Sequence, residues 1–292
     1  SIWRGGRCLF EALDFTLERA KLALLVGPNG VGKTTLLRVF AGLADPSSGS
    51  VTWAGQAVAR LPAFQRRDIA YRGHLDGLKK DLTVRENLSV YAGLYGSAED
   101  IDRLLDTFGL LAHADARAAE LSKGMRQKVA ICRVLLHEPD VLLLDEPTSG
   151  LDPEVSRNVR ALLDTRRARG CAILLSTHNL DEAERLADRV AVLHTRLVAV
   201  DTPRALRRRL ATGRVTIRTV THASEWLSAA RRFDAAATAD AVALRVSLAD
   251  ADRDTPALVS ALVAAGAAIV EVRPELPALE DVYLQLVDGS TR

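Results

Sequence analysis

This 292-residue chain lacks the features of a disulfide-stapled, zinc-binding or nucleic-acid-binding protein. It has three cysteines, Cys8, Cys132 and Cys171, an odd number without the C-x-x-C spacing of a zinc site or a disulfide framework. We therefore expect three buried thiols in a reducing compartment. The formal net charge is only +2, and the few aromatic residues do not alternate with basic ones. Both observations argue against a nucleic-acid partner.

Long apolar runs are also missing. The best candidate, residues 257–270, is shorter than the roughly 18 residues needed to cross a bilayer and contains Ser260 and Gly266. The N-terminus has no charged-then-apolar signal peptide and opens at Ser1, which is compatible with trimming. We expect no transmembrane segment, so that any membrane contact is peripheral.

The most informative segment present is an apolar strand, from Leu22, that runs into the pattern G-x-x-x-x-G-K-[ST]. Its glycines allow a tight turn whose amides face phosphate oxygens, the lysine adds a positive charge, and a threonine hydroxyl suits Mg²⁺. The helix after it presents its N-terminus to the same phosphates. The predicted nucleotide-binding residues are Gly27, Pro28, Asn29, Gly30, Val31, Gly32, Lys33, Thr34 and Thr35.

A second apolar strand, Val141–Leu144, ends in two adjacent carboxylates, Asp145 and Glu146. Neighbouring residues on a strand point in opposite directions, so the two acids can perform different tasks. We expect Asp145 to join Thr34 in the Mg²⁺ shell and Glu146 to orient and deprotonate the attacking water.

The order of elements predicts an α/β fold: a P-loop nucleoside triphosphatase with a mostly parallel sheet. Helical periodicity over about residues 76–139 indicates a helical insertion. We expect an ATP-binding domain over residues 1–211. Residues 212–292 have their own strand and helix rhythm, with helices expected over residues 223–233 and 254–265. This order is compatible with a small split βαβ arrangement and predicts an accessory α+β C-terminal domain. The Arg-rich segment after Pro203 is expected to be a solvated linker helix rather than a lipid contact.

Three further motifs surround the Asp145 strand: L-S-K-G-M-R-Q at Leu121–Gln127, S-G-L-D at Ser149–Asp152 and S-T-H at Ser176–His178. With the phosphate loop they make residues 1–211 resemble the ATP-binding subunit of an ABC transporter. The resemblance implies ATP and Mg²⁺ as ligands and a homodimer that sandwiches two ATP molecules.

In such a dimer, Ser122 and Gly124 would meet the γ-phosphate held by the other subunit, and Ser122 itself suits a helix N-cap. By the same resemblance, His178 would contact the γ-phosphate as a catalytic residue with Lys33 and Glu146. Asp152 would couple the two sites across the dimer.

Three positions depart from the family pattern. The signature keeps Ser122 and Gly124 but has Lys and Met where Gly and Gln are usual, a variant typical of exporters whose membrane subunit is a separate polypeptide. His74 ends I-A-Y-R-G-H where the family has a glutamine that senses Mg²⁺, so we expect a histidine metal sensor. Arg4 aligns with the adenine-stacking aromatic and could stack through its guanidinium plane.

Two finer resemblances point to export. Residues 4–88 resemble the haem-export ATPase of cytochrome c biogenesis, whereas L-E-D-V-Y-L-Q-L-V at Leu279–Val287 resembles drug and antibiotic export ATPases. The expected function is ATP hydrolysis that drives a separate integral-membrane permease at the cytoplasmic face of the cell membrane. The alternatives are an importer subunit and an ABC-type ATPase not coupled to transport, such as one that acts on ribosomes or DNA.

Overall fold

The computed structural model describes residues 1–73, 76–97, 99–209 and 213–289. The described chain forms two compact units, Ser1–Pro203 and Arg204–Gly289, each with its own sheet. The predicted division into an ATP-binding domain, residues 1–211, and an accessory domain, residues 212–292, stays a prediction.

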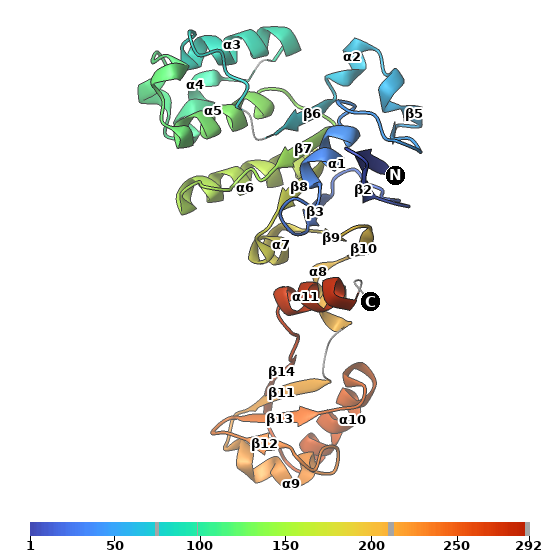
Figure 1. Cartoon of the computed structure of the whole chain (residues 1–292). Coiled ribbons are helices and arrows are strands. Elements are labelled where there is room, and N and C mark those ends of the chain that lie inside the picture. The colour runs from blue at the N-terminus through green and yellow to red at the C-terminus, as the bar shows by residue number, and fades with distance from the viewer. Residues whose placement is uncertain (74–75, 98, 210–212, 290–292) are drawn as a thin grey trace. The chain divides into compact units, whose positions relative to one another are not determined.

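The first unit is built on a six-stranded sheet with strand order β10-β9-β3-β8-β7-β6 (Figure 1). All neighbouring strands are parallel except β9 and β10, which are antiparallel. The mostly parallel sheet and the helical insertion confirm the predicted fold class. The strands are β3 (Leu22–Val26), β6 (Ile69–Arg72), β7 (Val141–Asp145), β8 (Ala172–Thr177), β9 (Arg189–Leu193) and β10 (Leu197–Asp201).

The central strands are continuous apolar runs because helices cover both faces of the sheet. Every residue of β3 and β8 is buried. On one face Leu25, Leu143 and Leu174 pack with Leu37 of the first helix and with Phe10. The carboxyl ends of β3, β7 and β8 therefore lie at one edge of a rigid sheet.

Helices α3, α4 and α5 gather into the helical insertion (Figure 1). Side chains cap each one: Thr83 forms a capping box with Glu86, Asp100 accepts from two amides of α4, and Ser122 accepts from the Met125 amide. The α-helices of this unit are α1 (Lys33–Phe40), α2 (Ala63–Arg66), α3 (Val84–Tyr95), α4 (Ile101–Thr107), α5 (Lys123–Leu135), α6 (Pro153–Ala168) and α7 (Leu180–Leu186).

The smaller elements of the first unit are two hairpins and three 3₁₀ turns. The hairpins pair β1 (Ile2–Arg4) with β2 (Arg7–Phe10) and β4 (Thr52–Trp53) with β5 (Gln56–Ala57). The 3₁₀ turns are η1 (Val58–Arg60), η2 (Leu111–His113) and η3 (Ala118–Glu120).

The second unit carries a four-stranded antiparallel sheet with order β12-β13-β11-β14. Helices η4, α9 and α10 pack over an apolar core that includes Ile217, Leu244 and Leu258. This is the predicted α+β C-terminal fold. Its elements are α8 (Pro203–Arg208), β11 (Arg214–Thr219), η4 (Ala223–Trp226), α9 (Leu227–Ala230), β12 (Thr238–Ala239), β13 (Ala243–Ser247), α10 (Ala251–Ala264), β14 (Ile269–Pro274) and α11 (Leu279–Gly289).

Two helix boundaries in this unit differ from the sequence expectation. The helix expected over residues 223–233 is a 3₁₀ turn followed by the short α9. The helix expected over 254–265 begins at Ala251, because the Asp250 carboxylate accepts from the amides of Asp252 and Arg253 and starts the helix before Pro256.

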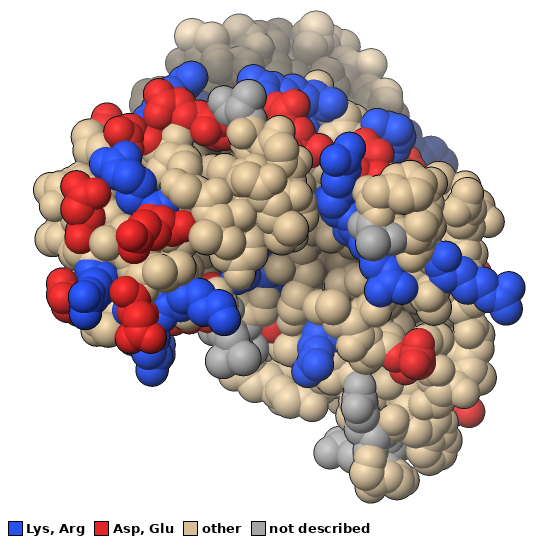
Figure 2. Space-filling view, turned by 90° about the horizontal axis from the view of Figure 1, so that it is seen from above, with Lys and Arg blue, Asp and Glu red and all other residues tan. Residues whose placement is uncertain are grey.

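Acidic and basic residues are interspersed over the face seen from above in Figure 2. Among the ion pairs of the first unit, Arg85 of α3 pairs with both Asp102 and Asp115. Among the described residues, every helix is too short or too polar to cross a bilayer.

The cysteines differ in exposure from the expectation of three buried thiols. Cys132 and Cys171 are buried, but Cys8 is only partly so, and all three are free. Burial raises the pKa of the Cys132 thiol and raises the pKa of Cys171 to about 12. Near neutral pH these two sulfurs therefore stay protonated and unreactive.

We expect an aromatic disulfide reagent at neutral pH to modify the native protein at Cys8 alone, and all three thiols after unfolding in guanidinium chloride. Absorbance of the released thiolate counts the reactive groups. The Cys8→Ser variant should show no rapid reaction in the native state. Rapid native-state labelling of Cys132 would contradict the burial described here.

Candidate functional site

The loop between β3 and α1 requires glycine at two positions. A Cβ on Gly27 would lie 2.5 Å from the Leu193 carbonyl oxygen. Gly32, the N-cap of α1, has φ of 107° in the left-handed region, and a Cβ there would lie 2.9 Å from the Phe10 ring. The turn thus brings backbone amides to the N-terminus of a helix, which favours anions.

Lys33 folds back over this loop. Its Nζ donates to the carbonyl oxygens of Gly27 at 2.7 Å and Pro28 at 3.1 Å, and the residue is 6% exposed. Burial lowers the pKa of Lys33, while the nearby Glu146 and Asp145 carboxylates act in the opposite direction. A cation is therefore held directly beside the phosphate loop.

The Asp145 carboxylate lies between two hydroxyl donors. Thr34 Oγ1 donates to Oδ2 at 2.5 Å, and Ser176 Oγ donates to Oδ1 at 2.5 Å. Hard oxygen ligands, completed by phosphate oxygens, are what Mg²⁺ prefers, and it often uses only one or two carboxylates. Thr34 and Asp145 fit such a site. In the described ranges no three His, Cys, Asp or Glu side chains cluster as a metal site of their own.

Glu146 has an unusual backbone. Its φ of 45° lies in the left-handed region, which side-chain-bearing residues seldom adopt. Its amide donates to the carbonyl oxygen and to the hydroxyl of Ser176, both at 3.1 Å. On the other side, buried Arg72 donates from Nη1 to the carbonyl oxygens of Asp145 at 2.9 Å and Glu146 at 3.3 Å.

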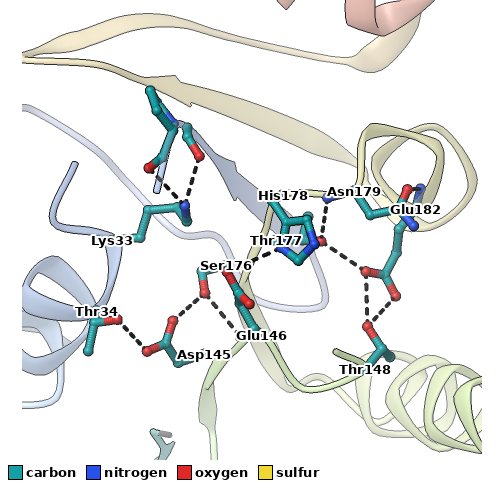
Figure 3. Close-up of polar contacts among 12 residues, drawn as sticks. Lys33, Thr34, Asp145, Glu146, Thr148, Ser176, Thr177, His178, Asn179 and Glu182 are labelled. Atoms are coloured by element: carbon teal, nitrogen blue, oxygen red, sulfur yellow. Dashed lines mark hydrogen bonds and ion pairs between the residues drawn. The ribbon is translucent and has the colours of Figure 1, made fainter. Parts of the chain in front are cut away.

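His178 follows the end of β8 and faces Glu146, which follows the neighbouring β7 (Figure 3). The distance from His178 Nδ1 to Glu146 Oε1 is 3.3 Å. The histidine side chain is 57% exposed and the glutamate side chain 19%. The Glu146 carboxylate, which can accept a proton, therefore lies beside the His178 ring, which can donate a hydrogen bond.

An open hollow of about 620 Å³ joins the phosphate loop to the two carboxylates. Its lining brings together six of the nine predicted phosphate-loop residues with both carboxylates and one residue of β2. The lining residues are Leu9, Asn29, Gly30, Gly32, Lys33, Thr34, Thr35, Asp145 and Glu146.

Comparisons with known proteins identify the family of this chain. Residues 10–149 match the family described as ABC transporter. The chain is 38% identical over 208 residues to the Nod factor export ATP-binding protein I of Rhizobium sp. (strain N33), an alignment that covers 69% of this chain and 68% of that protein. The chain belongs to the ABC transporter family. It is an ATP-binding subunit, of a kind that hydrolyses ATP.

Other relatives have similar names. The Nod factor export ATP-binding protein I of Burkholderia thailandensis is 39% identical over 206 residues, covering 68% of each chain. A solved structure described as an ATP-binding subunit of an ABC transporter superposes with a TM-score of 0.64 at 35% identity, covering 69% of this chain and 86% of that one. The fold is therefore that of an ABC ATPase.

Three other predicted site residues of this ABC subunit, Ser122, Gly124 and Asp152, are not among the lining residues of this hollow. Ser122 caps α5, with its hydroxyl accepting from the Met125 amide at 3.2 Å, and a Cβ on Gly124 would meet open space. Asp152 caps α6 through the Val155 amide at 2.9 Å, a bond that lowers the pKa of its carboxyl. Asp152 also lies 3.6 Å from Lys128 of α5.

Two predicted residues receive no side-chain description. Arg4, expected against adenine, is the last residue of β1, and its side chain lies outside the described part. His74, expected as the metal sensor, lies outside the described residues. Both roles stay predictions.

Two residues at the site were missed by the sequence reasoning. The sequence pattern identifies Ser176 only as part of the S-T-H motif, whereas in the structure its hydroxyl donates to Asp145. It identifies Arg72 only as part of I-A-Y-R-G-H, whereas in the structure the residue is 3% exposed. A charged residue at the end of a short, otherwise apolar segment is the available signal, since a buried arginine needs acceptors.

We expect Arg72→Met to lower the free energy of unfolding by about 1–3 kcal/mol, because it leaves the buried carbonyl of Asp145 without its charged donor. Guanidinium unfolding followed by circular dichroism measures the change. Arg67→Met is the matched control: its side chain is 61% exposed, so a change within about 0.5 kcal/mol is expected. A variant at position 72 more stable than the wild type would contradict this account of the guanidinium.

Proposed function

We propose that this ABC subunit hydrolyses ATP as a homodimer that sandwiches two ATP·Mg and drives export through a separately encoded integral-membrane permease. The observation that carries the proposal is the convergence of Lys33, Thr34, Asp145 and Glu146 at one sheet edge, with His178 at 3.3 Å from Glu146. The names of the relatives support the export direction, since they are called Nod factor export ATP-binding proteins.

Each residue has a distinct chemical task in this proposal. The loop amides and the Lys33 ammonium bind the β- and γ-phosphates. To do so, the ammonium breaks its hydrogen bonds to the Gly27 and Pro28 carbonyl oxygens. Thr34 and Asp145 would hold Mg²⁺, which when bound neutralises charge on the phosphate oxygens. Glu146 orients and deprotonates water, and His178 donates a hydrogen bond to the γ-phosphate.

The dimer part of the proposal rests on Ser122, Gly124 and Asp152. Ser122 caps a helix of 13 residues, and the Gly124 position is open to approach. These features make the start of α5 suitable for a phosphate held by a second subunit. The ion pair between Asp152 and Lys128 places the start of α6 beside α5, and we assign to Asp152 the coupling of the two sites across the dimer.

The permease, location and cargo follow from the export proposal. The subunit would sit at the cytoplasmic face of the cell membrane, held there by the permease. The cargo would be chosen by that permease. We keep haem export and drug export as the two specific hypotheses, on the resemblances of residues 4–88 and Leu279–Val287, and the neighbouring genes distinguish them.

We expect Glu146→Gln to lower kcat by about 10²–10⁴-fold while ATP binding persists, because the amide cannot take a proton from water. With ATP and Mg²⁺ the variant should elute as a dimer on size exclusion. Lys33→Ala is the control that should lose nucleotide binding as well. Turnover of Glu146→Gln within tenfold of the wild type would contradict the catalytic assignment, and a monomer in saturating ATP would contradict the sandwich.

We also propose that residues 212–292 form an accessory domain that tunes dimer or permease contacts. A chain ending at Gly213 should bind ATP with Kd unchanged within about threefold, because every predicted nucleotide contact precedes residue 179. Binding of a fluorescent ATP analogue measures this, with circular dichroism as the folding control. A folded truncation that no longer binds nucleotide would show that the tail helps to build the ATP site.

A further inference from the structure

We propose that Glu182 is a positioning residue that ties the loop carrying Glu146 to the loop carrying His178. Glu182 lies in α7, and the residue is 5% exposed. Its carboxylate holds these two loops at a fixed spacing. This role rests on the proposed tasks of Glu146 and His178.

The carboxylate of Glu182 reaches both loops directly (Figure 3). Thr148, two residues after Glu146, donates its hydroxyl to Oε1 at 3.0 Å and Oε2 at 3.1 Å. Thr177, the residue before His178, donates its hydroxyl to Oε2 at 3.1 Å. One buried anion thus joins the segment after β7 to the end of β8.

A buried carboxylate at this place needs a balancing charge, and α6 supplies it. Arg160 Nε lies 3.7 Å from Glu182 Oε1, and the glutamate side chain is 4% exposed. The buried carboxylate therefore has two hydroxyl donors and a guanidinium nearby. It holds these partners in one geometry, because moving any of them away leaves the buried charge without a partner.

Helix capping does not account for the direction of this side chain. In α3, the corresponding glutamate, Glu86, reaches back to the amide of its N-cap residue. In α7, the amide of the N-cap residue Asn179 instead donates to Thr177 Oγ1 at 3.0 Å. The Glu182 carboxylate is therefore directed across to Thr148, a contact that a capping role does not require.

The contact between His178 and Glu146, which we propose that Glu182 supports, is weak by itself. His178 is more than half exposed and touches Glu146 at a single distance of 3.3 Å. A hollow of about 210 Å³ is lined by Glu146, Thr148, Thr177, His178, Glu182 and their neighbours Ser149, Gly150 and Asn179. Both proposed catalytic groups and the proposed tether therefore face one space that is large enough for water.

Steady-state ATPase kinetics and binding of a fluorescent ATP analogue, on the full chain, test the role. Glu182→Ala should lower kcat by about 10–100-fold, because loss of about 1 Å of alignment has effects of that size. Nucleotide affinity should change by less than about threefold, since no Glu182 contact reaches the phosphate loop. Glu182→Gln keeps an acceptor oxygen and should recover most of kcat. Glu184→Gln, an exposed carboxylate on the same helix, is the matched control and should leave kcat unchanged.

Two isosteric variants keep the test valid if Glu182→Ala fails to fold. Thr148→Val and Thr177→Val each remove one hydroxyl and should each lower kcat at unchanged affinity. In the Glu182→Ala background, Thr148→Val should have no further effect, because the pair acts as a unit.

The proposal is overturned if both threonine variants keep kcat within about twofold of wild type, or if Glu182→Ala loses affinity and turnover together, as a merely structural role predicts. Glu146→Gln in the same assay separates the two levels of inference. If Glu146→Gln is inactive and the Glu182 and threonine variants are normal, only the tether is wrong. If Glu146→Gln retains turnover, the proposed catalytic assignment is wrong.

Discussion

The two hydroxyl bonds to Asp145 are the interaction on which the rest of the site depends. Thr34 belongs to α1 and Ser176 to β8, so one carboxylate joins the helix after the phosphate loop to the next strand of the sheet. The residue is 1% exposed, and without these donors its charge would carry a desolvation cost of several kcal/mol. The sheet order places β8 between β3 and β7, which brings these donors together.

Three other buried charged side chains, Lys33, Arg72 and Glu182, also hold parts of the site together. Lys33 donates to carbonyls of its own loop, Arg72 donates through Nη1 to carbonyls at the end of β7, and Glu182 accepts from hydroxyls of two loops. Each is held by groups from a different element. Elements that share a satisfied buried charge move together, because separating them exposes the charge to a medium that cannot solvate it.

The sequence predicts the parts of this site that are local and misses those that tertiary contacts create. The phosphate loop and the Asp145–Glu146 pair follow from glycine spacing and an apolar strand, and Ser122 is recognisable as an N-cap from its position before an amphipathic helix. Arg72 and Glu182 have no local motif of this kind. A partner of each lies far away in the chain: Asp145 is 73 residues from Arg72, and Thr148 is 34 residues from Glu182. Only the strand order shows that these residues meet. The start of α10 differs from the start that the apolar periodicity predicts, because the capping carboxylate of Asp250 begins the helix earlier.

The left-handed backbone conformation of Glu146 affects which residues this position favours during evolution. A φ of 45° costs a residue with a Cβ about 1–2 kcal/mol that glycine would not incur, and asparagine would incur less of it. Random replacement by these residues would therefore relieve strain while removing the carboxylate. Under the proposed catalytic role of Glu146, selection for a stable fold and selection for turnover act in opposite directions here. The glutamate is then kept by its chemistry and not by its contribution to backbone stability.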